Sequence, residues 1–262
     1  MNFFEALLLG IIQGITEFLP VSSSGHIELS KAIFGIDLLA KESLFFTLTL
    51  HLATAMSTMI VLRKTIYGQL LRILKGDQKS IDFATKIFIS MIPAILVGFF
   101  LEDLIRSVYH QNIILVGIML LLTAMVLFLS DRIKNSKRDL THLDTIIMGI
   151  SQAIAILPGI SRSGATIATG IMLKSDRKSI TEFSFLMVIP IIFGSMLHSI
   201  INANSIELTV AWFPLVIGFV SSLLTGIFAC IWMVHLVVQS QLKYFAIYCT
   251  IVGLSAICYE IF

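Results

Sequence analysis

Long apolar segments recur along the chain, and their length indicates what kind of element each one forms. A helix needs about 20 mostly apolar residues to cross the hydrocarbon core of a bilayer. Six segments meet this requirement, so the pattern predicts an all-α polytopic membrane protein with about six transmembrane helices. The predicted spans lie near Leu44–Leu62, Phe83–Leu101, Ile113–Ser130, Phe183–Asn202, Thr209–Val238 and Leu242–Phe262.

Two further apolar stretches, residues 3–40 and 145–173, are interrupted near their centres by proline, glycine and a run of hydroxyl residues. Such a run breaks the hydrogen bonding of a helix. Inside a bilayer, irregular backbone is tolerated only where it is buried in protein or lines a wet cavity. Each stretch is therefore predicted to form a re-entrant helix–loop–helix hairpin and not a span.

Composition supports a membrane location and excludes other classes. Apolar residues make up 57% of the 262 residues and charged residues only 13%, and the mean hydropathy is +0.96. A water-soluble globule of this size would need more polar surface. The net charge of +2 provides no polybasic face of the kind that binds nucleic acid, so we expect no nucleic-acid partner.

Basic residues indicate the orientation, because short cytoplasmic loops are enriched in Lys and Arg. Segments 63–86 and 131–144 are both basic, and two spans separate them, so both are predicted on the cytoplasmic side. Continuing along the spans places fourteen basic residues inside and Arg162 within the second hairpin; the three outside are Lys31, Lys41 and Arg106. In this topology the first hairpin enters the membrane from outside and the second from inside.

Opposite entry predicts an inverted repeat within a single membrane domain, 1–262, with halves of approximately 1–130 and 131–262. The segment Gln13–Gly25 aligns with Gln152–Gly164 when one residue is skipped. Each half also carries a span with an internal proline, Pro93 in one and Pro190 in the other. Inverted repeats with broken helices typically place a binding site at the midplane between them.

The first hairpin carries a buried acid followed by a hydroxyl-rich turn. Gln13 and Glu17 are four residues apart, so on a helix they share one face and can hold one ligand. A carboxylate in apolar surroundings faces a partner or a cavity, and a structural pairing of Glu17 is the alternative. The turn could bind an anion, although hydroxyls also cap helices. Its members are Ser22, Ser23, Ser24, Gly25 and His26.

The second hairpin carries the pattern of a phosphate cradle. A guanidinium in the middle of a bilayer needs an anionic or carbonyl partner, and Arg is suited to bidentate phosphate binding. A glycine-rich turn leading into a helix exposes backbone N–H groups, where the helix dipole also favours negative charge. The alternative is that Arg162 only pairs with Glu17. The cradle residues are Gly159, Ser161, Arg162, Ser163, Gly164 and Thr166.

These residues resemble the motifs of a known family, the undecaprenyl-diphosphate phosphatases of the bacitracin-resistance type. The resemblance lies in Gln13–His26, in Pro158–Thr166, and in Glu182–Leu186 with the later Pro190. The length and the hydrophobic profile also agree from end to end. The family has Glu or Gln four residues before its fixed glutamate, and here Gln13 leaves Glu17 as the only acid of the first motif.

The resemblance implies hydrolysis of undecaprenyl diphosphate to the monophosphate and inorganic phosphate, at the outer face of the bacterial inner membrane. That reaction recycles the lipid carrier for cell-wall polymers and accounts for bacitracin resistance. The catalytic residues expected on this basis are Glu17, Ser23, His26 and Arg162, and the substrate-binding residues are Gln13, Ser22, Ser24, Gly25, Gly159, Ser161, Ser163, Gly164 and Thr166.

Several features of the mechanism stay open at this level. Ser23 is the preferred nucleophile, with Glu17 as base or metal ligand and His26 as acid, while water or His26 are alternative attacking groups. We expect a divalent cation, Mg²⁺ or Ca²⁺, held by Glu17, Gln13 and substrate oxygens. The sequence does not fix the oligomeric state, so a homodimer stays open.

A second function class fits the same architecture. Inverted repeats with broken helices also build transporters, so the site could carry a lipid or an anion across the membrane. The combination of hydroxyls and a histidine with a phosphate cradle favours chemistry over transport. A purely structural membrane protein would leave the buried Arg162 and Glu17 without a purpose.

Overall fold

The computed structural model describes the backbone of residues 1–36, 40–109, 112–134, 136–202 and 212–261, and the side chains of these ranges apart from 40–42, 101–109 and 198–202. Within them the chain is helical and has no strand, which confirms the all-α prediction. The helices are α1 (Phe3–Phe18), α2 (Ser23–Phe34), α3 (Ala40–Val61), α4 (Arg63–Leu74), α5 (Gln78–Tyr109), α6 (Ile113–Asp131), α7 (His142–Ile154), α8 (Arg162–Met172), α9 (Arg177–Asn202), α10 (Trp212–Val238) and α11 (Leu242–Ile261).

Six helices in the described part of the chain are long and apolar enough to cross a membrane: α3, α5, α6, α9, α10 and α11. They confirm the six predicted spans. Two predicted boundaries, Thr209 and Phe262, lie outside the described residues. Helices α5 and α9 begin at Gln78 and Arg177, before the predicted starts, because each continues as polar turns beyond the apolar segment that hydropathy detects.

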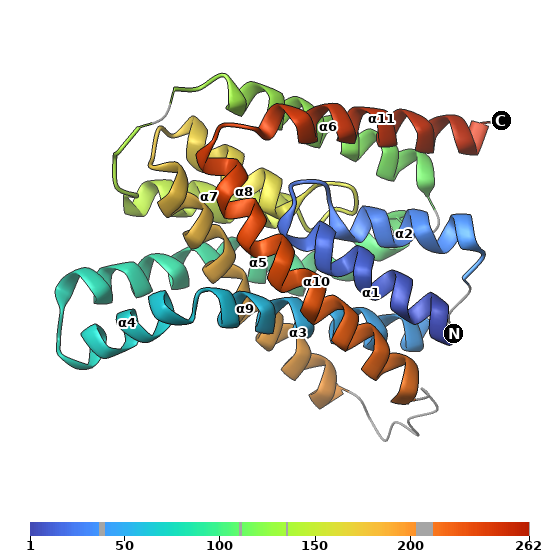
Figure 1. The fold of residues 1–262 in the computed structure, drawn as a ribbon, viewed down its shortest axis with the longest axis horizontal. Coiled ribbons are helices and arrows are strands. Elements are labelled where there is room, and N and C mark those ends of the chain that lie inside the picture. Colours follow the sequence, from blue (N-terminus) through green and yellow to red (C-terminus); the bar gives the residue numbers. More distant parts are fainter. Residues whose placement is uncertain (37–39, 110–111, 135, 203–211, 262) are drawn as a thin grey trace.

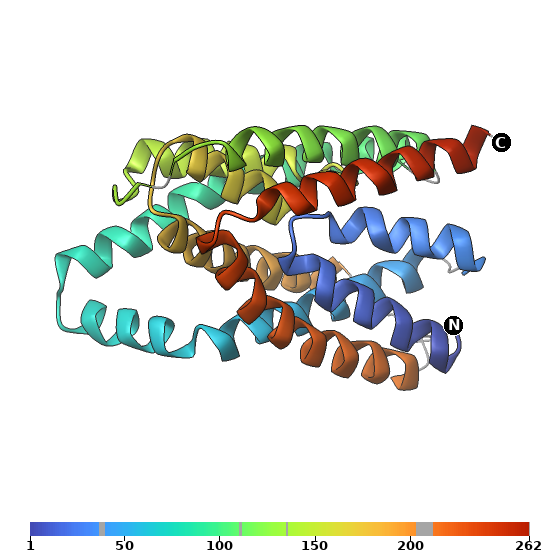
Figure 2. The ribbon, with the colours of Figure 1, turned by 45° about the horizontal axis from the view of Figure 1, so that its top comes forward.

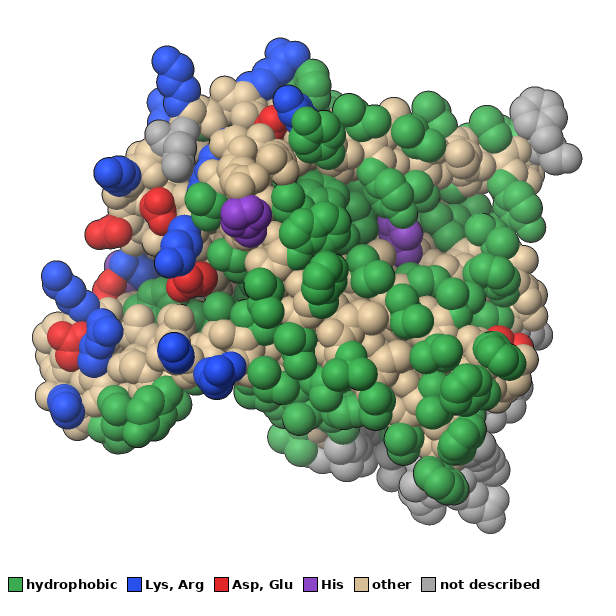
Figure 3. Space-filling view, viewed as in Figure 1, with side chains coloured by type: hydrophobic (Ala, Val, Ile, Leu, Met, Phe, Trp, Pro, Cys, Tyr) green, Lys and Arg blue, Asp and Glu red, His purple; other side chains and the backbone are tan. Residues whose placement is uncertain are grey.

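Residues 63–74, which the sequence marked only as a basic loop, form the separate helix α4. The segment consists largely of good helix formers and contains no proline, so its polarity does not prevent helix formation. Figure 3 shows Lys and Arg side chains gathered at the end of the molecule where α4 lies, and Figure 1 places both chain termini at the opposite end. This segregation agrees with the predicted placement of the basic segments on one side.

Two helix–loop–helix pairs, α1–α2 and α7–α8, occupy the places of the predicted hairpins. The four helices have 16, 12, 13 and 11 residues, so at about 1.5 Å per residue none exceeds about 24 Å and none can cross a core of about 30 Å. The two pairs enter from opposite ends of the molecule, and their loops approach one another near its centre (Figures 1 and 2). Their re-entrant placement in a bilayer stays a prediction.

The first helix of each pair packs on a long helix from the other half of the chain. Helix α1 lies along α10, and α7 lies along α5. Glycines allow this close approach: a Cβ atom added at Gly14 would lie 2.0 Å from Thr225 Oγ1, and one added at Gly149 would lie 2.4 Å from the Ser90 carbonyl oxygen. The two halves are therefore intertwined and do not form separate bodies.

The internal prolines do not occupy equivalent places in the order of elements. Pro93 lies in α5, the second predicted span after the first hairpin, whereas Pro190 lies in α9, the first span after the second hairpin. The two prolines therefore do not mark equivalent helices in the order of elements. The reciprocal helix packing, in contrast, is what a two-halved architecture would produce, and the inverted repeat stays a prediction.

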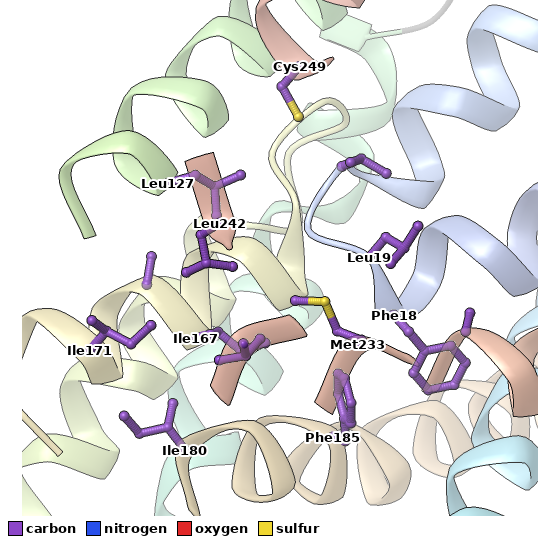
Figure 4. Packing of buried hydrophobic residues seen from close by; sticks show 14 of the residues in the cluster. Phe18, Leu19, Leu127, Ile167, Ile171, Ile180, Phe185, Met233, Leu242 and Cys249 are labelled. Atoms are coloured by element: carbon purple, nitrogen blue, oxygen red, sulfur yellow. The ribbon is translucent and has the colours of Figure 1, made fainter. Parts of the chain in front are cut away.

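The main hydrophobic core surrounds the meeting hairpin loops. Figure 4 shows Phe18 and Leu19 of the first hairpin near Ile167 of α8, Phe185 of α9 and Met233 of α10. The rings of Phe18 and Phe185 meet edge to face with centroids 5.3 Å apart, a favoured arrangement of aromatic pairs. The loops are thus held in a close-packed environment and not in open lipid.

The α1–α10 contact gives a stability prediction. We expect Gly14→Ala to lower the free energy of unfolding by about 1–3 kcal/mol, because the added methyl group overlaps Thr225 and the α10 backbone. A matched control is Gly98→Ala in α5, where an added Cβ meets nothing within 4 Å. Thermal unfolding in detergent measures both, and equal melting temperatures for the two variants would contradict this account of the packing.

Candidate active site

The two hairpin loops touch directly. Ser163 Oγ donates a hydrogen bond of 3.0 Å to the Leu19 carbonyl oxygen. A Cβ atom added at Gly25 would lie 3.2 Å from Gly159 Cα, so the backbones approach as closely as glycines allow. The residues of the two hairpins that the sequence predicted as parts of one site are therefore brought together.

The first loop is a tight turn between α1 and α2. Ser22 has φ of 70°, in the left-handed region that non-glycine residues seldom adopt. Its hydroxyl caps α2 by accepting from the Gly25 amide at 3.3 Å, and lies 3.4 Å from Ser24 Oγ. This geometry places Ser23 at the first turn of α2, with its side chain turned toward α1.

The second loop is fixed by a residue outside both hairpins. Thr123 of α6 donates through Oγ1 to the Gly159 carbonyl oxygen and accepts from the Ser161 amide, both at 3.1 Å. Gly159 has φ of +95°, and an added Cβ would lie 2.6 Å from the Val116 carbonyl oxygen. Ser161 in turn caps α8 by accepting from the Gly164 amide at 3.0 Å. The loop is thereby held so that α8 begins at Arg162.

An ion pair joins the hairpins at their meeting point. Arg162 Nη2 donates to Glu17 Oε1 at 2.5 Å, and Arg162 Nη1 donates to the Ser184 carbonyl oxygen at 3.2 Å. Glu17 is only 7% exposed. A carboxylate and a guanidinium at this depth compensate each other's charge, and either alone would be costly.

The other carboxylate oxygen of Glu17 contacts further polar side chains. Glu17 Oε2 accepts from Ser23 Oγ at 2.8 Å and from Gln13 Nε2 at 3.0 Å, and His51 Nε2 lies 3.7 Å away. Gln13 and Glu17 do share one face of α1, as their spacing predicts. A hydroxyl donating to a carboxylate is the geometry of a nucleophile beside its general base.

His26 is held by two partners. Its Nδ1 lies 2.8 Å from the Ser22 carbonyl oxygen, and its Nε2 lies 2.8 Å from the Tyr248 hydroxyl. Because a carbonyl oxygen only accepts, Nδ1 carries the proton, and in a neutral ring Nε2 then accepts from the tyrosine. The two rings are also stacked, with centroids 5.6 Å apart. The lone pair of Nε2 is therefore engaged in this arrangement.

Thr166 lies behind the arginine. Its hydroxyl is 2.6 Å from Ser184 Oγ and donates to the Arg162 carbonyl oxygen at 2.9 Å. Thr166 is fully buried, so in this geometry its hydroxyl supports the start of α8. Its predicted contact with substrate would need these bonds to be exchanged.

The residues present suit a divalent cation only in part. Among the described residues no group of three or more His, Cys, Asp and Glu side chains could hold a metal ion. Gln13 Oε1, however, is buried and has no hydrogen-bond partner, and it belongs to the residue that contacts Glu17. Mg²⁺ and Ca²⁺ bind such oxygens, and Mg²⁺ commonly uses few protein ligands together with substrate phosphates. Gln13 and Glu17 therefore fit a cation completed by a phosphate ligand.

Three residues of this arrangement were not singled out from the sequence: Thr123, Ser184 and Tyr248. Each is a hydroxyl in a predicted span, and that alone distinguishes them poorly from other span hydroxyls. Ser184 lies within the Glu182–Leu186 segment already noted, which was the best available signal. Gln152, which aligns with Gln13, is buried as well, and neither polar atom of its amide has a partner.

Comparison with known proteins gives a consistent family assignment. Residues 6–255 match the family model described as bacitracin resistance protein BacA. The undecaprenyl-diphosphatase of Christiangramia forsetii is 47% identical over 258 residues, and the alignment covers 98% of each chain. The undecaprenyl-diphosphatase of Bacteroides fragilis is 43% identical and that of Methanococcus vannielii 38%, with coverage of 97% or more of each chain.

The Thr123 clamp predicts a stability effect that is independent of any chemistry. We expect Thr123→Val to lower the free energy of unfolding by about 1–3 kcal/mol, since it leaves a buried N–H and a buried carbonyl unpaired. The control is Thr250→Val in α11, whose hydroxyl donates only to the carbonyl of Ala246 in the same helix. Thermal unfolding in detergent compares the two variants. A loss of stability no greater than that of the control would contradict the role of Thr123 in holding the second loop.

Proposed function

The chain belongs to the bacitracin resistance protein BacA family, and from this premise we propose that it hydrolyses undecaprenyl diphosphate to undecaprenyl phosphate and inorganic phosphate. The observation that carries the proposal is the cluster of Glu17, Ser23 and Arg162 at the contact of the two hairpin loops. The reaction returns a lipid carrier to cell-wall synthesis. Removal of the diphosphate also removes the target of bacitracin.

The diphosphate binds where two helices begin. Helices α2 and α8 start at Ser23 and Arg162, so their N-termini lie beside the touching loops, and each contributes partial positive charge to an anion there. The guanidinium of Arg162 adds a full charge and two parallel donors. The loop groups that complete the pocket in this proposal are Ser22, Ser24, Gly25, Gly159, Ser161, Ser163 and Gly164.

Ser23 attacks the terminal phosphorus. Glu17 Oε2, which already accepts from the Ser23 hydroxyl, takes its proton as the new O–P bond forms. The bond from this phosphorus to the bridging oxygen breaks, undecaprenyl phosphate leaves, and water later hydrolyses the phosphoserine to free phosphate. Catalysis of phosphoryl transfer depends mainly on positioning and charge neutralisation. Glu17, Ser23 and Arg162 can provide both.

Attack by His26 would need a prior rearrangement. Its Nε2 is bonded to Tyr248, so that contact must break before the ring can reach phosphorus as a nucleophile. Transfer of a proton from His26 to the leaving oxygen would also require a protonated ring. Ser23 has no such obstacle, which is why we assign it the nucleophilic role. We keep His26 as the acid for a state in which its ring is protonated and its Nε2 has left Tyr248.

A divalent cation completes the proposed site. Gln13 Oε1 and Glu17 would hold it together with phosphate oxygens, and when bound it supplies neutralisation of the charge on the diphosphate. The unpartnered, buried Gln13 Oε1 supports this assignment. The side chains themselves orient the hydroxyl of Ser23 and hold its proton.

The protein is a multi-pass membrane protein, and we place it in the bacterial inner membrane with the active site opening outward. The end of the molecule opposite the basic residues holds the chain termini and the outer end of the α1–α2 hairpin (Figures 1 and 3). Because basic residues favour the cytoplasmic side, this arrangement supports a site that opens outward. Transport of the same lipid is less well supported, because the named relatives are diphosphatases. A carrier would also not need a hydroxyl paired with a carboxylate, as in Ser23 and Glu17.

The role of Ser23 gives the first test. We expect Ser23→Ala to lower kcat for phosphate release from undecaprenyl diphosphate by at least about a hundredfold, because it removes the attacking oxygen. Ser30→Ala is the matched control on the same helix, since the Ser30 hydroxyl only donates to the His26 carbonyl oxygen. Phosphate release in detergent is the measurement.

The outcomes separate the function from the mechanism. A wild-type protein that releases no phosphate would overturn the diphosphatase assignment. Wild-type turnover in Ser23→Ala would leave the activity standing and transfer the attack to water or His26.

Cation dependence gives a second test. We expect chelation with EDTA to abolish turnover and excess Mg²⁺ or Ca²⁺ to restore it, because the diphosphate charge is then neutralised again. Gln13→Ala should raise the cation concentration needed for half-maximal turnover. The matched control is Gln69→Ala on α4, at the basic end of the molecule. Full activity in EDTA would contradict the cation proposal.

A further inference from the structure

An apolar groove, here called the α2–α11 groove, lies between α2, α6 and α11. Its cavity volume is about 210 Å³. Water occupies roughly 30 Å³ in the liquid, so the groove has room for part of a hydrocarbon chain and not for a whole long-chain lipid. Its lining includes Leu29, Ala32 and Ile33 of α2, Ile113 of α6, and Val252 and Ala256 of α11.

The walls of the groove are the same helix faces that reach the active site. On α2, His26 precedes Leu29 by three residues and Ile33 by seven, so the three side chains share one face. On α11, Tyr248 precedes Val252 by four residues and Ala256 by eight, which again is one face.

The hydrogen bond between His26 and Tyr248 therefore joins the two walls at their inner ends. His26 stands three residues after Ser23 on α2, and the lining of the groove begins at Leu29, one helical turn further along the same face. It continues from there along α2 and α11 toward the ends of both helices.

The two hairpins differ in how their second helix is covered. In α8, seven of 11 residues are buried, and a Cβ atom added at Gly170 would lie 2.6 Å from the side chain of Ile180 in α9. In α2, only three of 12 residues are buried, and Ala32 and Ile33 stay exposed. Of the two helices, α2 is thus the one that leaves an apolar path from the loops to the lipid.

We propose that the α2–α11 groove holds the isoprene units nearest the diphosphate while the rest of the chain remains in the bilayer. This inference rests on the proposed function, because it concerns the tail of that substrate. A headgroup bound at the hairpin loops has to release its chain along an apolar surface. The groove supplies such a surface, and its lining begins one helical turn beyond His26 on α2 and beyond Tyr248 on α11.

The His26–Tyr248 pair marks the boundary between headgroup and tail. His26 contacts the Ser22 carbonyl oxygen of the loop and the Tyr248 hydroxyl, and the apolar lining follows one turn further along α2 and α11. The chain gains little from the hydrophobic effect here, since it leaves lipid that is as apolar as the groove. What the groove contributes is van der Waals contact and a fixed direction for the bond that carries the phosphorus.

Filling the groove tests the proposal. In Ala32→Phe the added ring occupies the space assigned to the chain, and we expect the KM for undecaprenyl diphosphate to rise about tenfold with kcat little changed, as for other pockets that lose room for a few carbons. Leu254→Phe, on an exposed part of α11 that does not line the groove, is the control and should match wild type. All proteins are compared in the same mixed micelles, with thermal unfolding measured alongside.

Each outcome decides the question. An unchanged KM in Ala32→Phe is the result expected if only bilayer acyl chains fill the groove. It overturns the inference and leaves the diphosphatase assignment intact. An equal rise of KM in Leu254→Phe also overturns the inference. Loss of phosphate release in the wild-type protein overturns the function itself. Should Ala32→Phe unfold at a lower temperature than wild type, Ile33→Trp, at a side chain already 62% exposed, replaces it with the same expected rise.

Discussion

The ion pair between Glu17 and Arg162 is the interaction on which the rest of the structure depends. It joins residues 145 positions apart and makes the two hairpins one unit. Removing one partner of a buried pair leaves an uncompensated charge, which typically costs about 3–5 kcal/mol. The same contact that closes the fold thereby positions a hydroxyl, a carboxylate and a guanidinium within one small volume. The same ion pair therefore contributes both to the packing of the two hairpins and to the geometry of the site.

The pair also sets the conditions under which an anionic substrate can bind. In the proposed mechanism, a phosphate that takes Arg162 away from Glu17 would expose the carboxylate at Oε1, while Oε2 keeps its donors Ser23 and Gln13. In the proposed mechanism, Glu17 Oε2 then still lies beside Ser23 and can take its proton. The N-termini of α2 and α8 favour the incoming negative charge throughout. Under this proposal, exchange of one partner of the ion pair couples substrate binding to proton transfer from Ser23.

Much of this arrangement could be predicted from the sequence, because the bilayer restricts what a chain can do. Apolar length identified the spans, and polar interruptions identified the hairpins. The cost of isolated charge in hydrocarbon made a partner for Arg162 necessary. What could not be predicted depends on how each helix is rotated about its axis. Thr123 and Tyr248 are hydroxyls in apolar spans, and only the packing of α6 and α11 turns them toward the loops. Helix α4 was not predicted, because a polar helix gives no hydropathy signal.

The unequal covering of the hairpins suits the substrate that we propose for the site. A site sealed on all sides by spans could bind a free phosphate but not a headgroup with a long chain attached. One arm must therefore stay open to lipid, and an exposed apolar helix face is stable there because lipid replaces the missing protein neighbours. Helix α8 could not serve, since Arg162 at its start needs a rigid support from Thr166 and Ser184. Helix α2 carries Ser23, the proposed nucleophile, at its N-terminal end, and the rest of this helix borders the groove.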